Sequence, residues 1–132
     1  MKKTENTYLF TVEKTDTGFS AFAEDAPVYT TAKSSPDIIP NILEALNLYL
    51  EEETEFADVD RIKLQLDFQQ FFKYYKVLNA SYLAHRIGMN ESLLSQYVKG
   101  VKTPSQKQLD RILKGIHEIG KELSEIHLVA TK

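Results

Sequence analysis

The side chains with the clearest chemical potential lie in residues 79–100, NASYLAHRIGMNESLLSQYVKG. Hydroxyl, amide and carboxylate groups can form hydrogen bonds with base edges in DNA, and ammonium and hydroxyl groups can contact phosphates. At about 100° per residue from Leu94, one face of a helix collects four polar residues, which are Ser92, Ser95, Gln96 and Lys99. A helix that is apolar on one side and polar but lightly charged on the other is suited to lie in a groove.

Two short helices must position these side chains. The first buries Leu83 and Ile87, which are four residues apart and therefore on one face. Gly88 follows as a C-cap that tolerates positive φ, and Asn90 is a favourable N-cap for the second helix. Gly100 ends the second helix. The same pattern is also compatible with an ordinary helical hairpin that has a polar outer face.

Two helices joined by a short turn containing glycine are the signature of a helix-turn-helix. The segment resembles the Xre, or lambda-repressor-like, family of DNA-binding domains without a gap, through Leu83, Ala84, Ile87, Gly88, Leu94, Gly100 and the turn at Lys102, Thr103 and Pro104. Glu91 departs from the glutamine that is common at its place in that family. The resemblance implies that the second helix reads the major groove.

Base contacts are expected from the start and the outer face of that second helix: Asn90, Glu91, Ser92, Ser95 and Gln96. A glutamine can bond adenine through two hydrogen bonds, and a glutamate can accept from cytosine N4. Phosphate contacts are expected from a second group: Ser81, His85, Lys99 and Lys102.

Composition limits the classes of protein that the chain can represent. The chain has 132 residues and no cysteine, which excludes disulfides and thiolate metal sites. No apolar run approaches the roughly 18 residues of a membrane span, and the first ten residues lack the apolar core of a signal peptide. We therefore expect a cytoplasmic protein without cofactor, metal or membrane partner.

The net charge of −3 is distributed unevenly between the two halves of the chain. Residues 1–67 hold 6 Lys and Arg against 14 Asp and Glu, which gives −8, whereas residues 68–132 hold 10 against 5, which gives +5. A basic half suits phosphates, and an acidic half suits a different partner. We predict two domains, 1–67 and 68–132.

The acidic half shows the order β-β-β-α-β. Alternation and turn residues predict strands at 7–15, 19–23, 27–33 and 61–67, with a helix at 39–53. Ser35 is the expected N-cap of the segment that leads into this helix, with Pro36 at its first position. Ile62, Leu64 and Leu66 are expected to point inward from the last strand. An α+β layer with one helix on one face of a sheet follows.

This order, followed by a DNA-binding tail, resembles the HicB family of antitoxins, whose front domain is a partial ribonuclease H-like fold. The resemblance covers residues 7–67, and the Pro-Asp and Pro-Gly turn of that family is replaced by AEDAP at 23–27. It implies a HicA-HicB-type toxin-antitoxin system, in which a small basic toxin binds the front domain.

The basic half is expected to be entirely helical. Its first helix spans 68–78, with an aromatic stripe that its spacing assigns to the core. Ser105 caps a long final helix with an apolar stripe as far as Ile126. The far end of that helix, with Gly115 and Gly120, is expected to pack on the front domain or on a second copy.

An enzyme is not expected. A ribonuclease H-like fold suggests two-metal hydrolysis, but that chemistry needs carboxylates that converge from separate strands. Here Glu13, Asp16, Glu24 and Asp25 fall mostly at strand ends and turns, and there is no nucleophile motif or phosphate loop.

The sequence thus predicts a DNA-binding transcriptional regulator, the antitoxin and autorepressor of such a system, which binds double-stranded DNA as a homodimer or higher oligomer. Two alternatives remain open. One is a protein-interaction module whose helix-turn-helix is only a scaffold, and the other is a regulator whose front domain binds a small ligand.

Overall fold

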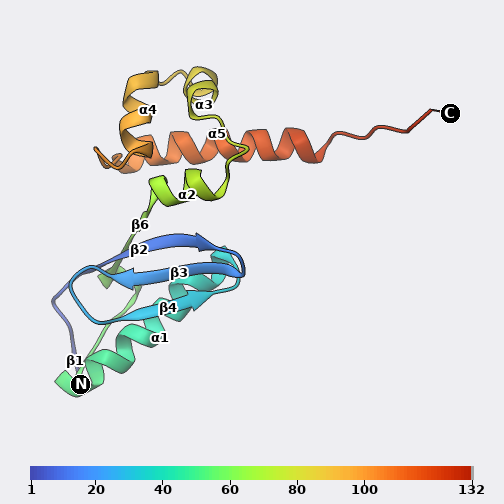
Figure 1. Ribbon diagram of the computed structural model, residues 1–132. Helices are drawn as coiled ribbons and strands as arrows, with labels where there is room; N and C mark the ends of the chain where they lie inside the picture. The colour runs from blue at the N-terminus through green and yellow to red at the C-terminus, as the bar shows by residue number, and fades with distance from the viewer. Residues whose placement is uncertain (132) are drawn as a thin grey trace. The chain divides into compact units, whose positions relative to one another are not determined.

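The computed structural model describes residues 1–131 and shows an α+β protein with five α-helices and two sheets in that range. The chain divides into two compact units, Met1–Tyr74 and Tyr75–Lys132. Each unit is described separately below (Figure 1).

The first unit is built on a four-stranded sheet whose order is β4-β3-β2-β6. Its strands are β2 (Tyr8–Thr15), β3 (Gly18–Ala23), β4 (Tyr29–Ala32) and β6 (Ile62–Leu66). The first three strands pair antiparallel, and β6 pairs parallel with β2, placing Phe10 opposite Leu64. The observed order of these strands and helix α1 (Ile38–Leu50) is the β-β-β-α-β order expected from the sequence.

One face of this sheet carries the core. Figure 1 shows α1 lying across it, and α1 contributes Ile42, Leu46 and Leu50, all nearly inaccessible. They pack in one cluster with alternate residues of the strands, among them Phe10 and Val12. The apolar residues of α1 recur every three to four positions and therefore share one face of the helix, whereas those of the strands recur at every second position and share one face of the sheet. These two apolar faces pack against each other, which is why these residues are buried together.

The opposite face of the sheet is polar at its centre. Thr11 and Ser20 are buried there, and Gln65 Nε2 donates to Thr11 Oγ1 over 2.9 Å. The Thr11 hydroxyl in turn donates to the Glu24 carboxylate. Buried hydroxyls need such partners, because an unpaired polar group away from water costs about 1–3 kcal/mol.

Two local expectations for this unit were wrong. Leu64 shares the core face with Phe10, its partner on β2, but it is 40% exposed rather than buried, because β6 is an outermost strand with a neighbour on one side only. Ser34, not Ser35, is the N-cap, and its hydroxyl donates to the Asp37 carboxylate instead of accepting from a backbone N–H. Residues Ser35–Asp37 form a 3-10 turn, so Pro40 falls in the first turn of α1, where no internal bond needs its missing N–H.

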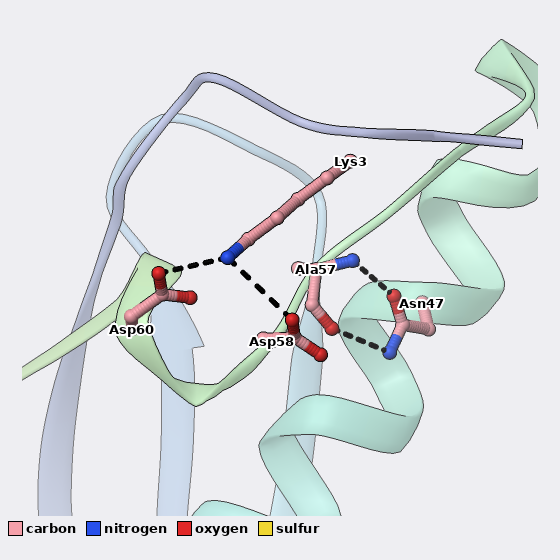
Figure 2. A network of polar contacts seen from close by, with 5 residues as sticks. All are labelled: Lys3, Asn47, Ala57, Asp58 and Asp60. Atoms are coloured by element: carbon pink, nitrogen blue, oxygen red, sulfur yellow. Dashed lines mark hydrogen bonds and ion pairs between the residues drawn. The ribbon is translucent and has the colours of Figure 1, made fainter.

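The N-terminus is held by a second, two-stranded sheet. Strand β1 (Lys2–Lys3) pairs parallel with β5 (Glu55–Phe56), which follows the 3-10 turn Glu51–Glu53. Figure 2 shows the Lys3 ammonium between two carboxylates, 2.8 Å from Asp60 Oδ2 and 3.5 Å from Asp58 Oδ2. The hydrogen bond to Asp60 raises the pKa of Lys3, and the same bond lowers the pKa of Asp60. Asp60 belongs to a further 3-10 turn, Val59–Arg61.

Helix α2 (Phe68–Tyr74) belongs to the first unit and lies beside β2 (Figure 1). Gln70 fixes it, because its side chain accepts from Lys14 N–H over 2.8 Å and donates to the Lys14 carbonyl over 2.6 Å. The sequence placed the domain boundary between residues 67 and 68 and extended this helix to 78. The compact units instead divide after Tyr74, where α2 ends.

The second unit contains α3 (Ala80–Ile87), α4 (Glu91–Val98) and α5 (Gln106–Ser124). Its buried side chains come from all three helices and from the turn before α4: Leu83, Ala84, Met89, Leu94, Tyr97 and Ile112. Ser105 caps α5 as predicted, accepting from Gln108 N–H over 3.3 Å. The apolar stripe of α5 is not buried to its end, since Leu123 is exposed.

The crossing of α3 and α5 depends on Gly115. A Cβ there would lie 2.4 Å from Ile87 Cγ2, whereas a Cβ at Gly120 would meet open space. We predict that Gly115→Ala lowers the free energy of unfolding of the second unit by about 1–3 kcal/mol, because the core would be overpacked. Gly120→Ala is the matched control and should stabilise the helix by up to about 1 kcal/mol. Urea denaturation of both variants measures this, and an equal gain in stability would show that the crossing tolerates a methyl group.

Asn47 on α1 bridges to the chain after β5. It accepts from Ala57 N–H over 2.7 Å and donates to the Ala57 carbonyl over 3.1 Å (Figure 2). We predict that Asn47→Ala costs about 1–3 kcal/mol in thermal or urea unfolding, because two partly buried backbone groups lose their partners. Asn41→Ala, on the same helix, removes a single exposed bond and should cost less. Equal costs for the two variants would contradict this account.

Candidate nucleic-acid interface

The turn between α3 and α4 sets the direction of both helices. Gly88 adopts φ +69°, a left-handed conformation that favours glycine, and Met89 N–H donates to the Ala84 carbonyl over 2.9 Å. Asn90 then begins α4 by accepting from Leu93 N–H over 3.1 Å. Asn79 begins α3 in the same way, accepting from Tyr82 N–H over 2.9 Å. The predicted C-cap and the predicted N-cap of α4 are both confirmed.

Arg111 on α5 forms hydrogen bonds with the backbone of this turn. One of its guanidinium nitrogens donates to the carbonyls of Ile87 and Gly88, over 3.0 and 3.2 Å, and the other donates to Gln108 over 2.9 Å. Sequence reasoning did not find this residue. Its backbone partners lie 24 and 23 positions away in the sequence, so no local pattern could have indicated the contact.

The structure brings most of the predicted interface residues to the surface of the second unit. Those that are exposed are Ser81, His85, Asn90, Glu91, Ser92, Lys99 and Lys102. Ser95 and Gln96 are only half-buried, while Leu94 behind them is fully buried. The start of α4 is therefore more open than its middle.

Two of the predicted residues bind each other. Ser81 Oγ donates to Glu91 Oε1 over 2.7 Å, joining the first turn of α3 to the first turn of α4. A carboxylate is favourable at the start of a helix, because the helix dipole is positive there. The bond occupies the Ser81 proton and places a negative charge among the residues expected to approach phosphates.

Gln96 lies where the chain folds back after α4. Its backbone carbonyl accepts from Val101 N–H over 2.9 Å and from Lys102 N–H over 3.3 Å. Its side-chain Oε1 is enclosed and has no hydrogen-bond partner. An enclosed, unpaired amide oxygen is unusual in a folded protein. If the side chain turned outward, that oxygen would lose no hydrogen bond.

Charge in this unit favours an anionic partner. Residues 75–132 hold 9 Lys and Arg against 5 Asp and Glu, which gives +4. One of the basic residues, Arg86, is paired with Glu122, whereas Lys99 and Lys102 lie exposed at the end of α4 and in the turn that follows. Within residues 1–131 no group of three or more ligand-type side chains is arranged to hold a metal ion.

Among the helices of residues 1–131, none combines the length and the apolar character needed to cross a membrane. In comparisons with known proteins, no family model, curated protein or solved structure matched the chain.

Proposed function

We propose that the protein is a DNA-binding transcriptional regulator in which α3 and α4 form a helix-turn-helix of the Xre type. The observation that carries the proposal is the two-sided character of α4, in which exposed Ser92 stands opposite fully buried Leu94. A helix anchored by such a residue presents its polar side as a fixed surface, which base readout requires.

The open start of α4 supports contact with base edges by Asn90, Ser92 and, after a side-chain rotation, Gln96. Lys99 and Lys102, which follow the last turn of α4, would neutralise phosphates beside the groove. Binding as a dimer would place two copies of α4 about 34 Å apart, one turn of the double helix.

The first unit would bind a protein partner. Residues 1–74 carry 7 Lys and Arg against 14 Asp and Glu, which gives −7 and favours a basic protein. Its β-β-β-α-β order, which resembles that of the HicB front domain, supports a HicB-type antitoxin that neutralises a small basic toxin and represses its own operon.

A competing function is a protein-interaction module that uses the same helices as a scaffold. The enclosed Oε1 of Gln96 and the Ser81–Glu91 bond favour it, because both reduce the number of groups that are free to contact DNA. DNA binding experiments separate the two functions.

Binding should be measured by mobility shift at several salt concentrations, on DNA selected by the protein from a random pool and on scrambled DNA. Lys102→Ala should weaken both complexes alike and reduce the salt slope by about one unit.

Gln96→Ala should reduce discrimination by about 1–3 kcal/mol at one base pair. Failure to select any sequence refutes the regulator, and equal losses on both DNAs for Gln96→Ala refute the role of Gln96.

Glu91→Gln tests the effect of the carboxylate at the start of α4. The amide oxygen of the new side chain can still accept from Ser81, but the negative charge near the phosphates is gone. We expect affinity for both DNAs to rise about fivefold, the equivalent of the roughly 1 kcal/mol between unit charges 4 Å apart in water. Glu125→Gln, beyond the end of α5, is the charge-matched control and should have little effect. An unchanged affinity for Glu91→Gln would place this carboxylate away from DNA.

A further inference from the structure

A groove runs along the free edge of the four-stranded sheet. Strand β4 is outermost in the order β4-β3-β2-β6, so its outer side has no neighbouring strand among the described residues. Between this edge and α1 lies a groove of about 330 Å³, lined by Thr30, Asn41, Glu44, Ala45 and Leu48. Figure 1 shows α1 passing close to β4 as it crosses the sheet.

The outer edge of β4 already accepts a hydrogen bond from outside the sheet. Asn41 Nδ2 donates to the Thr31 carbonyl over 2.9 Å. This carbonyl is therefore directed away from β3 and toward the groove. Backbone groups on a free edge can pair with a strand of almost any sequence, which makes such an edge a site for strand addition.

The groove joins an apolar surface to negative charge. Leu48 is 62% exposed although it is a leucine, and Ala45 beside it packs partly against the core. Glu44 lines the groove, and Glu51 and Glu52 follow Leu48 by three and four positions, near the same side of α1 and the turn after it. A long side chain with an apolar stem and a cationic end fits such a surface.

We propose that this groove binds an extended segment of a basic protein, which adds to β4 as a further strand. Its backbone pairs with the edge, taking the place of Asn41 at the Thr31 carbonyl. Lys or Arg side chains on the inward side lie against Leu48 and Ala45 and reach Glu44. This inference rests on the proposed function of the first unit and assigns the surface that the basic partner uses.

The probe is a fluorescein-labelled nine-residue peptide that alternates lysine and valine, titrated into the full chain and followed by fluorescence anisotropy and amide NMR shifts. Shift changes are expected at Thr30, Thr31, Glu44 and Leu48. A peptide that alternates glutamate and valine should not bind. The lysine peptide N-methylated at every residue should bind much more weakly, because neither of its edges can donate hydrogen bonds to β4.

Glu44→Lys should weaken binding of the lysine peptide by about fivefold or more, since an attractive pair becomes repulsive. Asp16→Lys makes the same charge change in the β2–β3 turn and should have less than half of that effect. Both residues are exposed, so neither variant is expected to unfold. Leu48→Ser, also at an exposed position, should weaken binding without changing the net charge.

Three results would overturn the inference: equal losses for Glu44→Lys and Asp16→Lys, undiminished binding of the N-methylated peptide, or shift changes confined to the polar face around Thr11 and Gln65. The last result would leave an acidic unit that binds a basic partner elsewhere, so the proposed function would stand. No DNA is present in these titrations, and their outcome is therefore independent of the DNA measurements.

Discussion

The second unit depends on the left-handed turn at Gly88. A residue with a Cβ is strained at φ +69°, so glycine lets the chain reverse within three residues and present Asn90 as the next cap. Arg111 adds charged donors to the carbonyls of Ile87 and Gly88, which have no partner within α3. Turn, cap and guanidinium together determine where α4 begins and which of its sides is exposed. Every proposed DNA contact of α4 depends on that direction.

Local patterns in the sequence predicted much of both units. The caps at Asn90 and Ser105, the positive φ of Gly88 and the hairpin of β2 and β3 all follow from interactions between residues a few positions apart. The exposure of Leu64 could not be predicted, because alternation indicates the face of a strand but not its place in the sheet. That place is fixed by parallel pairing with β2, more than fifty residues earlier in the chain.

The candidate interface could also be predicted only in part from local sequence patterns. Helical spacing placed Ser92, Ser95 and Gln96 on one side of α4, yet of these three only Ser92 is exposed. Gln96 is partly covered where the chain folds back after α4 and two backbone N–H groups bond its carbonyl. A helical wheel contains no information about the segment that follows the helix. The contact between Ser81 and Glu91 was also not foreseen, because ten residues and a turn separate them.

Charge connects the two proposed activities. A basic partner bound to the first unit would bring positive charge into the assembly, and DNA affinity rises with the number of phosphates that cations neutralise. By the reciprocity of linked binding, a partner that strengthens DNA binding would itself bind more tightly to the DNA complex. In the proposed complex Glu91 would oppose this trend, because its negative charge at the start of α4 would repel nearby phosphates whatever the base sequence. In a DNA-binding protein, a carboxylate at this position would reduce non-specific binding and leave a larger share of the affinity to contacts that depend on base sequence.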